Sequence, residues 1–309
     1  MVSMYQANDP PRSQPDEERR HRVAWTKGGA NREVAELLGD GIVRITGDLD
    51  ATCVDNRIEI LVTKRFPRSD VVPTVVPVEF DADTVTSLAV AVGDGPHSAR
   101  AVSIGETVAN ALGIPGTVIT AYRTSAELES AEERLTRLTD ARSGFETMAI
   151  QTPNPRTITE HLSKETLLVH GAAGGSFIDR HFTGTGNRLT SRALGSVLVV
   201  KDAPQRCFQI TVDPTGLALA PELLVSDALQ VMSHPFAPVV TNHQLLGIVR
   251  IRTLVRANPR ATIEQHVEAC HGIGICDPVQ AASAQRERFG PGPLPVVDDA
   301  GNLVGVIPS

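Results

Sequence analysis

A glycine-rich segment that directly follows a short apolar strand most constrains how this chain folds. The strand is predicted over residues 166–170, and glycines follow it at Gly171, Gly174 and Gly184, with Thr185 next to the last. Glycine lets the backbone approach a ligand closely, and exposed loop amides offer partial positive charge to an anion. The segment therefore predicts a phosphate site at the end of a strand. The alternative is a loop whose glycines serve turn geometry alone.

Strands and helices alternate throughout residues 86–204. The predicted strands are 87–92, 117–122, 146–151, 166–170 and 196–201, and the predicted helices are 98–112, 126–138 and one that begins at 158–162. Parallel strands need crossover connections, so this order predicts an α/β fold: a parallel sheet with helices on both faces. Ligands of such sheets bind beyond the carboxyl ends of the strands. We expect the Glu and Arg side chains of the second helix to be solvated.

The spacing Gly171-x2-Gly174-x9-Gly184-Thr185, together with this element order, resembles the ATP-binding branch of the universal stress protein family over almost all of residues 86–204. The resemblance implies a nucleotide-binding domain for ATP or another adenine nucleotide. The glycine amides would hold the phosphates, and Thr185 would add a hydroxyl near the start of the next helix.

The nucleoside end of this implied site departs from the family pattern. Family members that bind ATP usually place an Asp at the end of the first strand, where this chain has Gly93 followed by Asp94. The resemblance implies that Asp94 accepts hydrogen bonds from ribose or adenine, and that Ala121 supplies backbone contacts to the base. The alternative for Asp94 is a turn residue.

The first 85 residues divide into two parts, and the second, residues 21–85, resembles no family that we recognise. Residues 1–20 are rich in Pro, Arg, Glu and Asp and predict a disordered tail. Residues 21–85 predict an unassigned α/β appendage that caps or extends the next domain. Its expected elements are a helix over 31–38 and strands over 42–46, 57–63 and 75–80. Prolines around and within the last strand predict that it lies at a sheet edge; they are Pro67, Pro73 and Pro77.

An internal repeat organises the remaining chain. The letters PVV at 238–240 and LLGIV at 245–249 return as PVV at 295–297 and LVGVI at 303–307. Each copy predicts a β-hairpin, and a predicted helix precedes each hairpin, at 225–232 and 279–289. Repeats of this kind are units that bury their faces against one another.

The repeat resembles a tandem pair of cystathionine-β-synthase-type (CBS) domains over residues 207–309, with copies at about 207–257 and 258–309. The resemblance implies adenosine-containing ligands in the clefts between the copies. Many binders of the family carry Ser or Thr just after the hairpin, where this chain has Arg250 and Pro308, and Asp three residues on, where it has Thr253. Both ribose positions are thus degenerate. Arg250 and Arg252 either grip a phosphate or are solvated charges.

Composition limits the partners and the compartment. The chain has 309 residues, 41% of them hydrophobic and 21% charged, which is typical of soluble globular proteins. A formal net charge of −7 argues against nucleic acid as the main partner. No apolar run approaches a membrane span or a signal-peptide core, so we expect a cytoplasmic protein. The four cysteines are scattered and predict packing thiols rather than a metal site.

No catalytic motif accompanies these features. The sequence lacks a P-loop lysine, a nucleophile elbow and an H-E-x-x-H helix. The sequence therefore predicts a non-enzymatic regulatory protein: an adenine-nucleotide sensor that couples a universal-stress-like domain to a CBS pair and assembles as a homodimer. The alternatives are an interaction scaffold that has lost its ligands and a slow ATPase.

Overall fold

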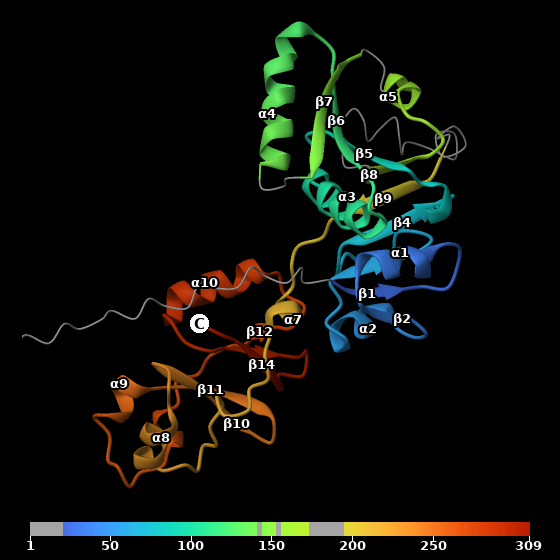
Figure 1. The fold of residues 1–309 in the computed structure, drawn as a ribbon. Helices are drawn as coiled ribbons and strands as arrows, with labels where there is room; N and C mark the ends of the chain where they lie inside the picture. The colour runs from blue at the N-terminus through green and yellow to red at the C-terminus, as the bar shows by residue number, and fades with distance from the viewer. Residues whose placement is uncertain (1–20, 141–143, 153–155, 173–194) are drawn as a thin grey trace, which may run out of the picture.

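The computed structural model describes residues 21–140, 144–152, 156–172 and 195–309. Within these residues the chain forms an α/β body and a C-terminal body, which lie next to each other and are joined at the short helix α7 (Figure 1). The predicted disordered tail, residues 1–20, lies outside the described residues.

The α/β body is built from alternating strands and helices. Its strands are β1 (Arg22–Trp25), β2 (Gly41–Arg44), β3 (Ile60–Val62), β4 (Thr74–Val78), β5 (Ser87–Val92), β6 (Gly116–Tyr122), β7 (Phe145–Gln151), β8 (Thr166–Gly171) and β9 (Val197–Lys201). Its helices are α1 (Asn31–Leu38), α2 (Leu49–Asp55), α3 (Ser98–Leu112), α4 (Leu128–Thr139) and α5 (Arg156–Glu160), with 3-10 turns η1 (Ala82–Thr84) and η2 (Ser125–Glu127). The predicted elements are confirmed, with shifts of a few residues at their ends. The sequence did not predict β1 and α2.

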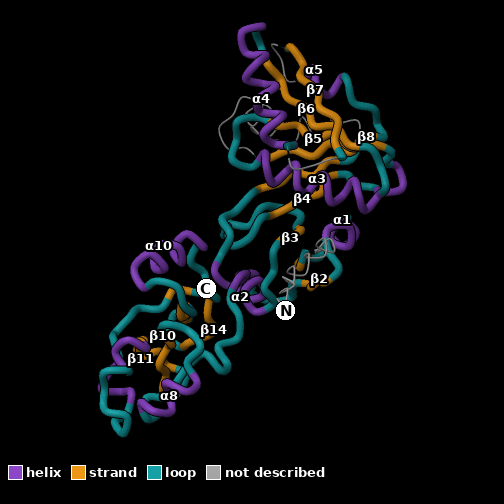
Figure 2. Tube along the Cα trace, turned by 60° about the vertical axis from the view of Figure 1, so that its left-hand side comes forward, coloured by secondary structure: helices purple, strands orange, loops and turns teal. Residues whose placement is uncertain are grey.

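All of these strands belong to one sheet, in the order β2-β1-β3-β4-β9-β8-β5-β6-β7. Every neighbouring pair is parallel except β4 with β9, which is antiparallel. The predicted parallel sheet is thus confirmed for β5 to β9. The N-terminal segment extends the same sheet (Figure 2), and its strands are parallel to one another. Because the two halves of the sheet meet antiparallel, the carboxyl ends of the strands in one half lie opposite the carboxyl ends of the strands in the other half. Below, the side of the sheet where a set of carboxyl ends lies is called an edge.

The expected edge position of the strand over 75–80 is wrong. β4 lies inside the sheet, between β3 and β9. Its parallel ladder with β3 covers only Thr74 and Val75, so the missing N–H of Pro77 falls beyond that ladder. Pro73 contributes its carbonyl oxygen, which accepts a hydrogen bond from the Leu61 amide at 2.9 Å. Both prolines therefore sit where no backbone donor is needed from them toward β3.

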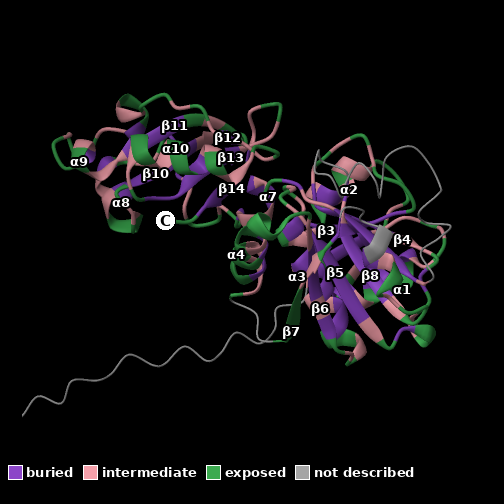
Figure 3. Ribbon diagram, turned by 90° about the horizontal axis from the view of Figure 1, so that it is seen from above, coloured by how far each residue is buried: buried purple, intermediate pink, exposed green. Residues whose placement is uncertain are grey.

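Apolar residues of the helices cover both faces of this sheet. On one face, α1, α3 and α4 pack on the strands and bury Val34, Ile104 and Leu135. On the other face, Ile158 of α5 is fully buried against Ala89 and Ile119. The central strands are buried along most of their length (Figure 3). Of the helices in the described part of the chain, none has an apolar stretch long enough to cross a bilayer.

The C-terminal body contains the two repeat copies. Its elements are α7 (Cys207–Ile210), α8 (Val225–Val231), β10 (Phe236–Thr241), β11 (Gln244–Arg250), α9 (Ile251–Leu254), η3 (Ile263–His266), β12 (Ile273–Gly274), α10 (Val279–Phe289), β13 (Leu294–Val297) and β14 (Leu303–Ile307). Both predicted hairpins are confirmed, since β10 pairs with β11 and β13 with β14, each antiparallel. Each hairpin has a register shift at the same place in the repeat, just after Val239 and Val296.

The hairpin of each copy pairs with a short segment that leads into the other copy. The segment that leads into the first copy pairs with the hairpin of the second, through an antiparallel bridge between Val212 and Val306. Reciprocally, Glu268, which leads into the second copy, pairs with Ile248 of the first. The hairpin glycines make room for these crossings. A Cβ on Gly305 would lie 2.2 Å from Cγ2 of Thr211.

The C-terminal body docks on the N-terminal half of the sheet through α7. Phe208 is 1% exposed and packs in a cluster with Cys53, Ile58 and Val72 of the α/β body. Next to it, Nε2 of Gln209 donates a hydrogen bond to the Ile58 carbonyl at 3.1 Å. Because the same helix begins the repeat region, the two bodies are packed together at this point.

Candidate functional site

The sequence-predicted nucleotide site is described only in part. Gly174, Gly184 and Thr185 lie outside the described residues. The sheet register brings the other three predicted residues to one edge, because Val92 pairs with Thr120 and Ala91 pairs with His170. Gly171, Ala121 and Asp94 therefore all lie at the carboxyl ends of β8, β6 and β5, where ligands of such sheets bind.

Asp94 is held by an arginine of the neighbouring helix. Nε and Nη2 of Arg134 donate to the two carboxylate oxygens of Asp94 at 2.7 and 2.8 Å, and Nη1 donates to Oγ1 of Thr120 at 3.0 Å. The side chain of Arg134 is only 12% exposed, so the expectation that the charges of this helix are solvated is wrong for Arg134. Asp94 itself is 74% exposed, and each oxygen keeps a lone pair for a further donor.

A second polar group connects β8 and β9 to the start of α3. A Cβ on Gly171 would lie 2.9 Å from Cβ of His97, so the absence of a side chain allows His97 to pack over the strand end. Nδ1 of His97 accepts a hydrogen bond from the Asp202 amide at 3.1 Å, which places the ring proton of neutral His97 on Nε2. The Asp202 carboxylate in turn accepts a hydrogen bond from Nε of Arg100 at 3.0 Å.

Sequence reasoning missed His97, Arg100, Arg134 and Asp202 at this edge. Their partners are distant in the chain, since Arg134 pairs 40 residues away and Arg100 pairs 102 residues away. Ser98 gave the only local signal, because a serine opens the predicted helix. Its hydroxyl donates to the Gly93 carbonyl at 2.9 Å and lies 3.2 Å from the Gly93 amide.

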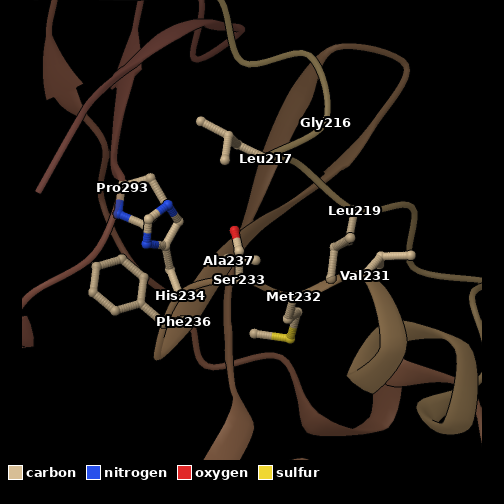
Figure 4. A pocket seen from close by; sticks show the side chains of 10 residues that line it. All are labelled: Gly216, Leu217, Leu219, Val231, Met232, Ser233, His234, Phe236, Ala237 and Pro293. Carbon is tan, nitrogen blue, oxygen red and sulfur yellow. The ribbon is translucent and has the colours of Figure 1, made fainter. Parts of the chain in front are cut away.

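The C-terminal body has a shallow pocket of about 230 Å³, open solvent included. The residues around it are Gly216, Leu217, Leu219, Val231, Met232, Ser233, His234, Phe236, Ala237 and Pro293. Pro293 belongs to the second copy and the others to the first, so the wall is completed by both copies (Figure 4). The lining is mainly apolar, with Ser233 and His234 as its polar side chains.

Arg250, which follows the first hairpin, is neither solvated nor free. Its side chain is 12% exposed, Nε donates to a carboxylate oxygen of Glu268 at 2.9 Å, and Nη1 donates to the Phe289 carbonyl at 3.0 Å. The guanidinium carbon lies 5.8 Å from the ring centroids of both Phe236 and Phe289. Arg250 thus joins the two copies, and neither expected role, a phosphate grip or a solvated charge, describes its contacts. Arg252 is exposed.

Cys53, Cys207 and Cys270 have the properties of packing thiols, whereas Cys276 is exposed and is not one. Burial, with a smaller contribution from Asp50, raises the pKa of Cys53 to about 12, and burial raises the pKa of both Cys207 and Cys270 to about 11. A thiol with such a pKa is protonated at neutral pH and reacts slowly. In the part of the chain that the structure describes, no three His, Cys, Asp or Glu side chains gather as metal ligands.

Comparison with known proteins identifies one region of the chain. Residues 210–260 match the family model "CBS domain", so the first repeat copy is a CBS domain. No curated protein matches the chain. The resemblance of residues 86–204 to universal stress proteins stays a prediction.

Several solved structures of CBS proteins are similar to the chain. One is a CBS domain pair/ACT domain protein from Thermotoga maritima, with 16% identity, a TM-score of 0.32, and coverage of 34% of this chain and 89% of that one. Another is the CBS pair of a Mg²⁺ transporter from Shewanella oneidensis, with 21% identity, a TM-score of 0.31, and coverage of 44% and 81%. A third is a CBS domain protein from Pyrobaculum aerophilum complexed with AMP, with 17% identity, a TM-score of 0.31, and coverage of 34% and 87%.

Proposed function

We propose that this chain is a non-enzymatic sensor of adenine nucleotides, in which the C-terminal CBS pair binds the nucleotide and passes its occupancy to the α/β body. The observation that carries the proposal is the CBS domain at residues 210–260, whose pocket is completed by Pro293 of the second copy. A solved CBS protein in complex with AMP is consistent with this ligand class.

The pocket favours the adenosine part of such a ligand. Leu217 and Met232 offer partly exposed apolar surface for a purine above the buried Leu219 and Phe236, and Ser233 and His234 offer polar contacts at its side (Figure 4). Arg250 is already satisfied by Glu268 and the Phe289 carbonyl. We therefore expect adenosine and AMP to contribute most of the affinity, with little added by further phosphates.

A continuous segment connects this pocket to the sheet. Phe208 is buried in the α/β body, Val212 pairs with the second copy, and Gly216 and Leu217 line the pocket. A ligand that orders Gly216 and Leu217 more in one state than in another shifts the equilibrium between those states. The segment from Phe208 to Leu217 is therefore the route by which occupancy reaches the α/β body.

The direct test is calorimetric titration of the full chain with AMP, ADP and ATP. The informative variant is Leu217→Glu, which places a carboxylate in the pocket and should weaken AMP binding at least about tenfold by charge repulsion and loss of apolar contact. The matched control is Leu246→Glu, because Leu246 is 37% exposed and does not line the pocket. No heat of binding for the unmodified chain, or equal losses in both variants, would contradict the proposal.

The α/β body is proposed as a second nucleotide site, specific for ATP, at the edge that holds Asp94, Ala121 and Gly171. The support is that Asp94 is exposed at this edge and keeps acceptor capacity. Gly174→Val should abolish an ATP-specific heat while leaving the AMP heat unchanged. An ATP response identical in the variant and the unmodified chain would remove this second site. Release of phosphate from ATP faster than in buffer would contradict the non-enzymatic role.

An interaction scaffold without ligands is the second candidate. The arginine at the degenerate ribose position, Arg250, favours it, because this side chain already joins the two copies. Native mass spectrometry of the purified chain distinguishes the two functions. A scaffold carries no nucleotide and shows no thermal shift with AMP, whereas a sensor shows a shift that rises with AMP concentration.

Assembly as a homodimer is also part of the proposal. The first copy exposes several large apolar side chains away from the pocket, among them Val255 at 67% and Leu224 at 39%, which another subunit could cover. Light scattering should give twice the mass of one chain. A monomeric mass at micromolar concentration would contradict dimer formation.

A further inference from the structure

The N-terminal half of the sheet has a switch point of its own. The chain runs from β1 to β2 on one side of β1, and then crosses to β3 on the other side. In parallel sheets the loops after two such strands separate, which leaves a crevice at their carboxyl ends where ligands bind. Here the two loops begin at Thr26 and Thr63. This crevice lies outside the matched CBS domain, residues 210–260.

Four basic side chains gather around this crevice. They are Lys27 after β1, Arg44 at the end of β2, and Lys64 and Arg65 after β3, and together we name them the basic edge. All four are exposed, and none forms an ion pair with a carboxylate among the described residues. The chain as a whole has a formal net charge of −7, so four unpaired cations in one region give that region a positive charge opposite in sign to the rest.

Contacts place these side chains together rather than merely at one edge. A Cβ on Gly28 would lie 3.8 Å from Cδ of Lys64, so the Lys64 side chain crosses over the residue next to Lys27. The guanidinium carbon of Arg44 lies 5.7 Å from the centroid of the Trp25 ring, at the end of the adjacent strand. The Lys64 side chain thus lies over the loop that carries Lys27, and Arg44 lies on Trp25 at the end of β1.

Buried hydroxyl and amide groups form a fixed floor between the lysines. Oγ1 of Thr26 donates to Oγ1 of Thr63 at 3.0 Å, and Nδ2 of Asn31 donates to the Thr26 carbonyl at 2.8 Å. Asn31 is 1% exposed and Thr63 is 8% exposed. Because these bonds tie the two loops together, the bases of Lys27 and Lys64 are held at a fixed separation.

The carboxylates of this region are engaged with other groups. Glu33 accepts a hydrogen bond from the Ala82 amide, Glu36 pairs with Arg32, and Asp48 accepts one from the Ala51 amide at the start of α2. Asp50 accepts a hydrogen bond from the Ser69 hydroxyl. These carboxylates thus have partners other than the four cations of the basic edge, which leaves those cations available to a ligand.

We propose that the basic edge binds a phosphate-bearing small molecule between Lys27 and Lys64, with Arg44 as a third cation. Phosphate fits because its several oxygens accept hydrogen bonds from more than one cation at once. A small molecule fits better than nucleic acid, because the cations occupy one crevice rather than an extended stripe. The site lies at the opposite edge of the sheet from Asp94 and Gly171, and it does not depend on the nucleotide sites proposed above.

Intrinsic fluorescence tests this site directly, because Trp25 is the only tryptophan of the chain. Titration of the full chain with inorganic pyrophosphate, at constant ionic strength, should change the emission of Trp25 and reach saturation. Lys27→Gln combined with Lys64→Gln should weaken binding at least about tenfold, because each lost charged hydrogen bond contributes substantially. The matched control is Lys164→Gln, an exposed lysine just before β8.

Each outcome decides for or against the site. Saturation with pyrophosphate that is lost in the double variant and kept in the control supports it, and calorimetry of the same proteins confirms that binding rather than quenching is measured. A response that sodium chloride reproduces, or that is equal in the double variant and the control, overturns it. Tighter binding of a single-stranded oligonucleotide than of pyrophosphate also overturns it. AMP binding should be unchanged in the double variant, so failure here is distinct from failure of the CBS-pair proposal.

Discussion

The two edges of the nine-stranded sheet have the same kind of topology and opposite electrostatics. At the carboxyl ends of β5, β8 and β9, charges are neutralised within the protein by Arg134 with Asp94, Arg100 with Asp202, and Lys201 with Asp70. We name this the paired edge. At the basic edge, the cations have no such partners among the described residues. The comparison teaches that a parallel sheet supplies a position for a ligand, whereas the side chains around it decide whether that position is already filled.

The largest expected effect lies beside the paired edge, where α7 docks. Phe208→Ala removes a ring that is 1% exposed among Cys53, Ile58 and Val72, and it should lower the free energy of unfolding by about 3–5 kcal/mol. Chemical denaturation measures this. The control is Phe66→Ala, because Phe66 is 36% exposed and should change stability by less than about 1 kcal/mol. Equal losses in both variants would show that α7 does not join the bodies.

A smaller effect is expected inside the paired edge. Arg134→Met keeps the aliphatic stem and removes the hydrogen bonds to Asp94 and Thr120, so we expect a loss of about 1–2 kcal/mol. Arg137→Met, in the same helix and exposed, serves as the control. The loss should shrink in Asp94→Asn, where the ion pair is absent. An Arg134 variant as stable as its control would place Arg134 in solvent.

A smaller loss in the free energy of unfolding is expected at alkaline pH, and it arises in the region where α7 docks. The pKa of Cys53 is raised from 9.0 to about 12 by burial, so the folded state holds its proton more tightly than the unfolded state. This contribution is fully present below pH 9 and is lost as pH rises toward 12, at about 1 kcal/mol by pH 10. Denaturation curves at pH 8 and pH 10 measure the loss, which should be smaller in Cys53→Ala. Identical pH dependence in that variant would mean that other groups account for it.

The smallest effect on stability is expected at the basic edge. Lys64→Ala removes a cation without an ion-pair partner, so stability should change by less than about 0.5 kcal/mol. Thermal denaturation with and without pyrophosphate sharpens this contrast. The unmodified chain should gain stability from pyrophosphate and Lys64→Ala should gain less. A large loss of stability in Lys64→Ala without pyrophosphate would indicate that Lys64 has a partner within the protein. The basic edge and the paired edge would then not differ in how their charges are neutralised.

Local pattern in the sequence predicted much of the fold. Strand and helix signals in the sequence placed β5, α3 and α10 at their observed bounds. β5 is a short apolar run, α3 buries one apolar face, and a proline precedes α10 and a glycine follows it. The repeated PVV and hairpin glycines predicted both hairpins of the CBS pair. The place of β4 was not predictable from its prolines, because tolerance of Pro77 depends on how far the neighbouring strand extends.

The pairing of charged side chains at the two edges was harder to predict. Arg134 has the spacing of a solvated helix residue, and only the sheet register shows that Asp94 and Thr120 face it. Lys27 and Lys64 lie 37 positions apart, and they become neighbours only because β3 pairs with β1 on the side away from β2. Whether two distant side chains become neighbours depends on the order of the strands in the sheet, and hydrophobic patterns in the sequence do not determine that order.

Hydrogen–deuterium exchange of the full chain with saturating AMP tests most directly whether the CBS pair senses a nucleotide and passes the signal to the sheet. We predict slower amide exchange at the pocket, residues 216–219 and 233–237, continuing through 206–212 to β9, with no change at residues 26–31 and 63–65. Exchange that is unaltered by AMP throughout the chain, or altered at the pocket and unchanged at 206–212, would contradict this account.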